Sequence, residues 1–157
     1  MNSVKKEIIT IVGAGMMGSA MAFPAFDNGH EVRLVGTPLD REIIDGLNKN
    51  GHHKTLKRDM PQGVKFYQIE ELQAALDGAT LLIGGVSSFG VDWFCDEVLS
   101  VIPESLPVIS ITKGLHCASD GSITSFPAYM KKKSGRNLCL NAIGGPCISF
   151  ELAVLGY

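Results

Sequence analysis

Three glycines near the N-terminus have the spacing of a turn that binds a pyrophosphate. Residues 13–18 read Gly-Ala-Gly-Met-Met-Gly, which fits the pattern G-x-G-x-x-G. In such a turn Gly13 permits the tight bend, Gly15 lets the backbone approach the phosphates, and Gly18 lets the next helix pack closely on the preceding strand. The N-terminus of that helix offers free N–H groups and a partial positive charge. The segment therefore predicts a dinucleotide-binding turn.

The surroundings of the turn decide how much the pattern means, because G-x-G-x-x-G alone is a weak signal. An apolar, β-branched strand is predicted before it over residues 7–12, and a helix rich in Ala and Met follows over 19–28. Pro24 is expected to bend this helix or to end it early. A second strand is predicted over 31–35. This strand–turn–helix context favours a nucleotide site over a glycine-rich turn without a ligand.

A second group of candidate residues follows the later strands. Ligands of open α/β sheets bind beyond the carboxyl ends of the strands, so the segments that follow the strands are expected to line the site. These segments are Val86-Ser87-Ser88-Phe89, Thr112-Lys113-Gly114-Leu115 and Gly144-Gly145-Pro146-Cys147. Lys113 is the most informative of them, because an ammonium group beside a bound nucleotide supplies positive charge to a carbonyl or phosphate. The alternative for Lys113 is a solvated surface lysine.

Nucleotide preference is expected to be set after the second strand. There an acidic side chain binds the ribose 2′-OH of NAD, whereas a basic one accommodates the 2′-phosphate of NADP. Residues 36–41 read Gly-Thr-Pro-Leu-Asp-Arg, so no carboxylate follows the strand directly. Thr37 is small and hydroxylated, and Arg41 is near. Asp40 could still serve NAD, and Arg41 could equally be an ordinary helix residue. The segment favours NADP slightly over NAD.

The elements that must position these residues alternate along the chain. Strands are predicted over residues 7–12, 31–35, 64–69, 79–86, 107–112 and 138–143. Helices are predicted over residues 19–28, 41–50, 70–77, 91–102, 122–133 and from 148 onward, with a polar, irregular loop over 51–63. Alternation of this kind predicts an α/β fold, namely a Rossmann-type, doubly wound and mainly parallel sheet with helices on both faces.

Composition excludes several classes of protein. The 157 residues fit one domain, with 45% hydrophobic residues, 19% charged residues and a formal net charge of −2. No apolar run is long enough for a membrane span, and the near-neutral charge disfavours a nucleic-acid binder. Cys95, Cys117, Cys139 and Cys147 form no C-x-x-C pair and no zinc pattern, so no metal site is expected. Reduced thiols and the absence of a signal peptide indicate a cytoplasmic protein.

Three segments together match the order and spacing of one known enzyme family. They are the glycine turn with residues 28–34 (NGHEVRL), the run 111–115 (ITKGL), and Gly145-Pro146-Cys147 with Glu151-Leu152-Ala153. They resemble the bacterial and archaeal NAD(P)-dependent glycerol-3-phosphate dehydrogenases, whose last segment reads G-P-[S/T]-x-x-x-E-[L/V]-A. The segments cover nearly the whole chain, and their combination is much more specific than the glycine turn alone.

The resemblance implies a role for individual residues. The implied cofactor contacts are Gly13, Gly15, Met16, Met17, Gly18, Thr37, Val86, Ser87, Lys113 and Ser149. Lys113 would also be the catalytic residue, holding the substrate as charge develops on its oxygen, with Gly145 and Cys147 beside it. The implied reaction is reversible hydride transfer between nicotinamide C4 and C2 of dihydroxyacetone phosphate, giving sn-glycerol 3-phosphate. Such a reaction belongs to glycerol-3-phosphate metabolism and supplies phospholipid biosynthesis.

The chain departs from the family pattern at several positions. Ser87 stands where the family usually has proline, Cys147 where it has serine or threonine, and Ser149 where it has alanine. A thiol is a poorer hydrogen-bond partner than a hydroxyl, so Cys147 leaves the exact substrate open. A dehydrogenase for another small acid or phosphate, of the ketopantoate reductase or hydroxyacid dehydrogenase type, is therefore an alternative.

The family also continues with a helical domain that residues 1–157 lack. That domain carries a second lysine, the proton donor and acceptor, and closes the substrate site. The resemblance therefore implies that residues 1–157 are a dinucleotide-binding domain, truncated at its C-terminal end and inactive alone, with an exposed apolar face near residue 157. A stand-alone nucleotide-binding or redox-sensing module is the alternative. Whether the full-length form is a homodimer stays open.

Two further segments could take part in binding or catalysis. His116 follows the Lys113 segment and could act as a general acid or base, although the resembling family uses no histidine there. Residues 52–58 form a basic loop that could attract an anionic substrate by electrostatic steering. The alternative for this loop is a mobile polar connection.

Overall fold

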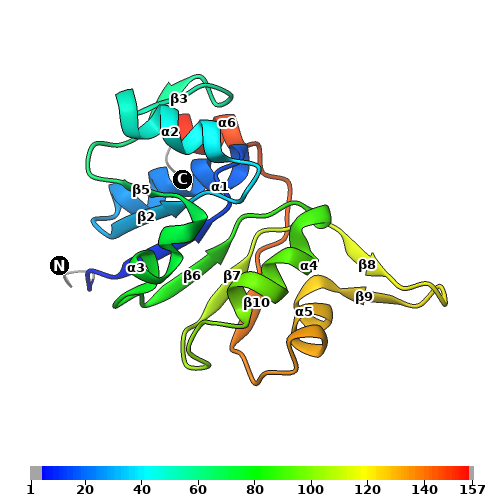
Figure 1. The fold of residues 1–157 in the computed structure, drawn as a ribbon. Coiled ribbons are helices and arrows are strands. Elements are labelled where there is room, and N and C mark those ends of the chain that lie inside the picture. Colours follow the sequence, from blue (N-terminus) through cyan, green and yellow to red (C-terminus); the bar gives the residue numbers. More distant parts are fainter. Residues whose placement is uncertain (1–4, 156–157) are drawn as a thin grey trace.

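A six-stranded parallel sheet forms the centre of the computed structural model, which describes residues 5–155 (Figure 1). Its strands are β1 (Ile8–Val12), β2 (Glu31–Val35), β5 (Lys65–Tyr67), β6 (Leu81–Gly84), β7 (Val108–Ser110) and β10 (Leu140–Ala142). They lie in the order β10-β7-β6-β1-β2-β5, and every neighbouring pair is parallel. Read from β5, this is the 3-2-1-4-5-6 order of the doubly wound dinucleotide-binding fold. The predicted fold class is therefore confirmed.

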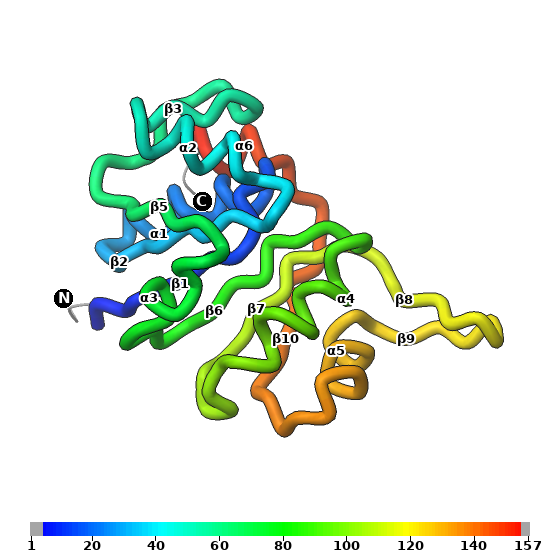
Figure 2. Tube along the Cα trace, in the orientation of Figure 1, coloured from blue at the N-terminus to red at the C-terminus, as the bar shows by residue number. Residues whose placement is uncertain are grey.

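Helices cover both faces of the sheet. One face carries α1 (Met16–Asp27), α2 (Arg41–Asn50) and α6 (Ser149–Leu155). The other face carries α3 (Leu72–Leu76), α4 (Val91–Trp93), the π-helical η3 (Phe94–Leu99) and α5 (Phe126–Ser134). Figure 2 shows that α6, at the red end of the chain, returns to lie beside α1 at the blue end. The last helix therefore contributes to the same edge of the molecule as the glycine turn.

Two hydrophobic cores lie on the two sides of the sheet. Adjacent residues of β1 show the division, because Ile11 packs into the core beneath α1 and α2 whereas Val12 packs into the core beneath α3 and η3. Both side chains are fully buried. Successive side chains of a strand point to opposite faces, so a strand covered on both faces requires mostly apolar side chains. The uninterrupted apolar runs of the sequence follow from this requirement.

Two hairpins depart from the predicted elements. Strands β3 (His52–His53) and β4 (Arg58–Asp59) pair where an irregular loop is predicted over 51–63. Strands β8 (Leu115–Cys117) and β9 (Ile123–Ser125) pair across the start of the helix predicted over 122–133. That prediction is wrong at its N-terminal end, because Ser125 caps α5 by accepting a hydrogen bond from the Ala128 N–H. The helix therefore begins at Phe126.

Several other boundaries differ from the prediction. Helix α1 begins at Met16 rather than at residue 19, and it runs through Pro24 to Asp27. Pro24 lies near the helix end and costs only one N–H bond, while its carbonyl accepts the N–H of Asn28. The strand predicted over 64–69 ends at Tyr67, since Ile69–Glu71 forms a 3₁₀ turn, η1, before α3. The helix predicted over 91–102 is partly π-helical, as η3.

A buried arginine joins β2 to the end of α3. Arg33 is 9% exposed, and its Nη1 donates hydrogen bonds to the carbonyl oxygens of Ala75 (3.1 Å) and Asp77 (2.6 Å). The last carbonyls of a helix have no partner within the helix, so Arg33 supplies one. Its Nε also donates to Glu31 at 2.9 Å. The hydrogen bonds from Lys65 and then from Arg33 lower the pKa of Glu31.

We expect Arg33→Met to lower the free energy of unfolding by about 1–3 kcal/mol, because it leaves the carbonyl oxygens of Ala75 and Asp77 without their donor, while Glu31 keeps only Lys65. Urea unfolding followed by circular dichroism measures the change. Because the pKa of Glu31 lies below its ordinary value of 4.5, its contribution is present above about pH 4.5 and is lost as the pH falls further. The variant should therefore lose less stability on acidification than the wild type.

The matched control is Arg41→Met, which removes the exposed ion pair between Arg41 and Glu70. Exposed pairs contribute about 0–1 kcal/mol, so the control should unfold at nearly the urea concentration of the wild type. Equal losses in the two variants would contradict the role given to Arg33.

Candidate nucleotide-binding site

The glycine turn lies between β1 and α1, against the end of β6. Gly13 has a φ of +112°, and a Cβ atom added to it would lie 2.6 Å from the carbonyl oxygen of Gly85. A Cβ added to Gly18 would lie 2.0 Å from the carbonyl oxygen of Gly13, whereas one added to Gly15 would meet no atom within 4 Å. Gly13 and Gly18 are thus required by backbone packing, and Gly15 faces open space.

The start of α1 offers free hydrogen-bond donors to that space. Gly15 is the N-cap residue, in an extended conformation. Within residues 5–155, the N–H groups of Gly15, Met16 and Met17 donate to no protein acceptor. Unpaired N–H groups and the positive end of the helix dipole together attract an anion. The turn therefore has both the room and the donors that a pyrophosphate requires.

Asp40 ties the loop after β2 to the glycine turn. Its Oδ2 accepts hydrogen bonds from the Ala14 N–H (3.1 Å), the Thr37 N–H (2.9 Å) and the Thr37 hydroxyl (2.8 Å). Asp40 is the residue that could bind the ribose of NAD, and one of its two carboxylate oxygens is therefore already hydrogen-bonded within the protein. Arg41, the candidate partner of a 2′-phosphate, pairs instead with Glu70 at the surface.

Two adjoining cavities lie on either side of Gly15 and share Gly85, Val86 and Ser87 in their walls. One measures about 450 Å³ and is also lined by Gly13, Thr37, Pro38, Leu39, Asp40, Phe89, Gly90 and Trp93. The other measures about 460 Å³ and is also lined by Met16, Met17, Ser88, Ile111, Thr112, Lys113, Cys147 and Ser149. A hydrogen bond of 2.9 Å from the Thr112 hydroxyl to the Val86 carbonyl joins two of the lining segments.

The cavities bring together almost all of the residues predicted to contact the cofactor. Gly18 is the exception, since it is buried behind the turn and lines neither cavity. The walls also contain residues that the sequence prediction did not select, chiefly Gly85, Leu39 and Trp93. Of these residues, only Gly85 had a signal in the sequence, because the Gly84-Gly85 pair at the end of an apolar run indicates close backbone packing.

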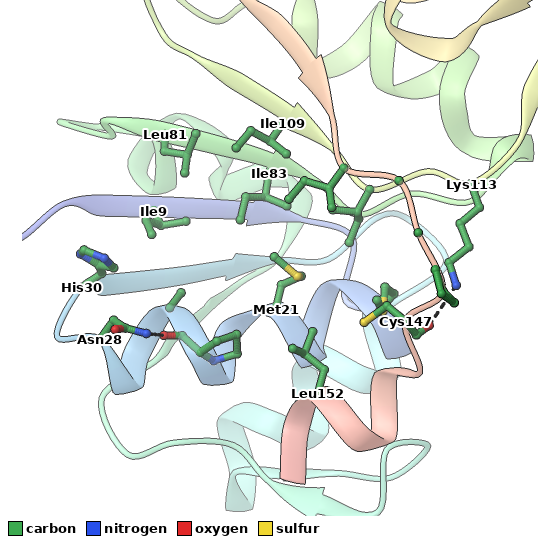
Figure 3. Close-up of a pocket in the computed structure, with 18 residues that line it drawn as sticks. Ile9, Met21, Asn28, His30, Leu81, Ile83, Ile109, Lys113, Cys147 and Leu152 are labelled. Carbon is green, nitrogen blue, oxygen red and sulfur yellow. Dashed lines mark hydrogen bonds between the residues drawn. The ribbon is translucent and has the colours of Figure 1, made fainter. Parts of the chain in front are cut away.

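Lys113 lies where the second cavity meets a third, apolar one of about 490 Å³. Its Nζ donates a hydrogen bond of 3.0 Å to the carbonyl oxygen of Cys147, and Gly145 lines the same region. Figure 3 shows Lys113 and Cys147 at one end of the apolar cavity, with Leu81, Ile83 and Ile109 projecting from the sheet. Among the described residues that line this cavity, Lys113 alone carries a permanent charge. A small phosphate would therefore be attracted to the Lys113 end.

His116, by contrast, does not lie with Lys113. It belongs to β8 of a hairpin that extends away from the sheet (Figure 1). Its ring stacks on Tyr129 of α5 with a centroid separation of 3.6 Å, and the Tyr129 hydroxyl donates to Asp92 at 2.5 Å. Within the part of the chain that the structure describes, His116 lines none of the cavities above. The structure therefore gives no support to the suggestion that His116 acts as a general acid or base.

Neither a metal site nor a membrane span is found among residues 5–155. No three His, Cys, Asp or Glu side chains of this range converge in a way that could hold a metal ion. No helix among these residues has the length and apolar character needed to cross a bilayer.

Comparison with known proteins adds evidence independent of this geometry. The family described as "NAD-dependent glycerol-3-phosphate dehydrogenase N-terminus" matches residues 8–155. An NADP(+)-dependent glycerol-3-phosphate dehydrogenase of Archaeoglobus fulgidus is 34% identical over 146 residues, covering 93% of this chain and 43% of the relative. A glycerol-3-phosphate dehydrogenase [NAD(P)+] of Shouchella clausii is 27% identical, covering 93% and 42%. The chain thus spans less than half the length of these relatives.

Solved structures agree with the sequence matches. A glycerol-3-phosphate dehydrogenase from Coxiella burnetii superposes with a TM-score of 0.78 and 25% identity, covering 95% of this chain and 44% of the other. A ketopantoate reductase from Ralstonia eutropha superposes less well, with a TM-score of 0.54 and 18% identity, and shares the fold alone. Since the family match runs from β1 to α6, the chain belongs to the family of the N-terminal domain of NAD-dependent glycerol-3-phosphate dehydrogenase.

Proposed function

We propose that this chain is the cofactor-binding half of an oxidoreductase that transfers hydride between NAD(P)H and dihydroxyacetone phosphate, giving sn-glycerol 3-phosphate. The observation that carries the proposal is the pair of cavities flanking Gly15, with unpaired N–H groups between them and Lys113 at the far end. The family match and the names of the relatives support the same reaction.

The residues present fit a dinucleotide along this path. The N–H groups of Gly15, Met16 and Met17 would hold the pyrophosphate, since the open space at Gly15 would be filled by any side chain. Gly13 and Gly18 would shape the turn, Thr37, Val86 and Ser87 would line the adenosine side, and Ser149 would line the nicotinamide side. When bound, the cofactor supplies the hydride.

Lys113 would act on the substrate as well as on the cofactor. As hydride reaches C2 of the ketone, negative charge develops on the carbonyl oxygen, and the Lys113 ammonium group would stabilise that charge. Among the described residues that line the adjoining apolar cavity, no other side chain carries a permanent charge that could attract the phosphate of the substrate. Gly145 and Cys147, which line the same end, would define the position of the substrate backbone.

NADP is the cofactor that we propose this site prefers, with NAD as the alternative. No carboxylate follows β2 directly, and Asp40 already accepts three hydrogen bonds through one oxygen. Both side chains of the Arg41–Glu70 ion pair are exposed, so the pair contributes little free energy. Arg41 can therefore exchange Glu70 for a 2′-phosphate. The Archaeoglobus relative is named as NADP(+)-dependent. Clearly tighter binding of NADH than of NADPH would overturn the preference.

A second half would be needed for turnover. Reduction of the ketone requires a proton in addition to the hydride, and in this proposal the group that supplies it belongs to the part that the longer relatives carry beyond the matched region. Several apolar side chains near the end of the described chain are about half exposed, and this second half would cover them. They are Ile143 (53%), Ile148 (59%), Phe150 (51%) and Val154 (46%).

The chain of 157 residues is therefore expected to bind NADPH saturably and to lack dehydrogenase turnover. Cofactor fluorescence titration measures the first property, and the loss of absorbance of NADPH in the presence of dihydroxyacetone phosphate measures the second. Absence of any saturable binding would contradict the cofactor assignment. Steady-state oxidation of NADPH by the isolated chain would contradict the need for a second half.

A further inference from the structure

His53 is the buried polar residue of the β3–β4 hairpin, in a segment that the sequence marks only as basic. It is fully buried, unlike its neighbours His52 and Lys54. The N–H of Leu56 donates a hydrogen bond of 3.0 Å to Nδ1 of His53, so Nδ1 carries no proton. In the neutral ring the proton then lies on Nε2, which is 2.9 Å from the carbonyl oxygen of Ala14. His53 therefore donates to the glycine turn.

Both polar groups of the Ala14 backbone are held by side chains from elsewhere in the chain. Asp40 accepts the Ala14 N–H at 3.1 Å. The carbonyl oxygen of Ala14 receives the His53 Nε2–H and, at 3.1 Å, the hydroxyl of Ser19. A turn that must present free donors to a ligand needs its other polar groups tied down, and at Ala14 they are.

The carbonyl of Ala14 and the N–H of Gly15 belong to the same peptide unit. Peptide bonds are trans throughout the described residues, and in a planar trans peptide these two groups point in opposite directions. Holding the Ala14 carbonyl toward the hairpin therefore directs the Gly15 N–H away from it, and Gly15 lines both candidate nucleotide cavities.

We propose that His53 is a positioning residue for the phosphate-binding turn. By donating to the Ala14 carbonyl it sets the plane of the Ala14–Gly15 peptide, so that the Gly15 N–H is already aimed at the pyrophosphate before the nucleotide arrives. Because less ordering is then needed on binding, the affinity rises. This inference rests on the proposed function of the turn, and it makes the hairpin part of the cofactor site although none of its residues touches the cavities beside Gly15.

The hairpin has packing of its own that should survive a change at His53. Leu56 and Met60 are buried in the same core as α1 and α2. The Arg58 guanidinium lies over the Phe23 ring of α1, 5.4 Å from its centroid. A substitution that changes one hydrogen bond of His53 is therefore expected to leave the hairpin docked on α1.

Two amide substitutions separate the two hydrogen bonds of His53. In His53→Gln the side-chain NH₂ reaches about as far as Nε2 and keeps a donor for Ala14, but the Leu56 N–H loses its acceptor. In His53→Asn the side-chain oxygen replaces Nδ1 and keeps the acceptor for Leu56, but the bond to Ala14 is lost. Each variant removes one buried bond, so both should lower the melting temperature of the chain to a similar degree.

Fluorescence titration with NADPH then distinguishes positioning from general stability. We expect His53→Asn to weaken NADPH binding about tenfold and His53→Gln to stay within about threefold of the wild type. Leu56→Ala is the matched control, since it removes buried packing from the hairpin and keeps both hydrogen bonds of His53. It should lower the melting temperature without changing the affinity.

The outcomes separate this inference from the function on which it rests. Wild-type affinity in folded His53→Asn, or a weakening in His53→Gln as large as in His53→Asn, would overturn the role of His53 while leaving nucleotide binding intact. If His53→Asn does not fold, His53→Gln still tests the role of His53, because a loss of NADPH affinity in His53→Gln would overturn that role. A wild-type chain that binds no NADPH would overturn the proposed function and the role of His53 with it.

Discussion

Replacing Gly15 by alanine is expected to weaken NADPH binding by about 10–100-fold while leaving the fold intact. The φ of Gly15 is −67°, which alanine adopts freely, and the added Cβ meets no protein atom within 4 Å. The same open space is where the pyrophosphate would approach the backbone, so the methyl group would be forced against the ligand. Overpacking of this kind costs about 1–3 kcal/mol, which converts to the stated loss of affinity.

Gly18→Ala is expected to act on the fold itself. Its Cβ would lie 2.0 Å from the carbonyl oxygen of Gly13, and a backbone atom cannot move aside as a flexible side chain can. The free energy of unfolding should fall by about 3 kcal/mol. Urea unfolding and NADPH titration, carried out on both variants, separate the steric effect on the ligand from the steric effect on the protein.

Gly46→Ala provides the matched control for both. Gly46 lies within α2, and a Cβ there also meets nothing within 4 Å, but the position is outside the candidate site. Alanine is better than glycine in a helix by about 1 kcal/mol, so this variant should be slightly more stable and should bind NADPH normally. If Gly15→Ala bound NADPH as well as Gly46→Ala, the pyrophosphate could not lie at Gly15.

The second large effect is expected at Lys113. In a form of the protein that also contains the second half found in its relatives, Lys113→Met should lower kcat/KM for dihydroxyacetone phosphate by about 100–1,000-fold, the range for removal of one group that stabilises an oxyanion. The Nζ atom has one protein partner in the described chain, the carbonyl oxygen of Cys147. The side chain is exposed, so the melting temperature of the isolated chain should hardly change.

Lys132→Met is the control for Lys113, because Lys132 is an exposed lysine at the end of α5, away from the cavities. It removes the same formal charge, and its kcat/KM should stay within about twofold, since an exposed charge at this distance is largely screened. A loss of kcat/KM that was equal in the two variants would indicate a general effect of charge. It would contradict a direct role of Lys113 at the substrate.

The alternation of strands and helices was predictable because its signal is local and repeated. The strands at the centre of the sheet, β1, β6 and β7, are mostly apolar runs, and the glycine turn marks the first strand–helix junction. Parallel strands place their carboxyl ends at one edge, so residues that follow different strands, such as Ser87, Lys113 and Cys147, come together without any contact between them being specified in advance. Most of the candidate site followed from this rule.

The hairpins were not predictable in the same way. Strands of two or three residues, such as His52–His53 and Ile123–Ser125, are too short to show the alternation by which a strand is recognised. Their pairing depends on turns and on packing against α1 or α5, neither of which leaves a periodic pattern. Residues 51–63 were therefore expected to be irregular, and the burial of His53 was not foreseen.

The sequence by itself determined the class of fold, the glycine turn and the residues that follow each strand. These depend on runs of apolar residues, on the backbone freedom of Gly13 and on the absence of a side chain at Gly18. Only the tertiary structure decided what surrounds the turn. The contacts from Asp40 and His53 to Ala14 join residues 26 and 39 positions apart, and His116 was directed away onto Tyr129. Such contacts depend on how the elements pack in space, and no local spacing of residue types records that packing.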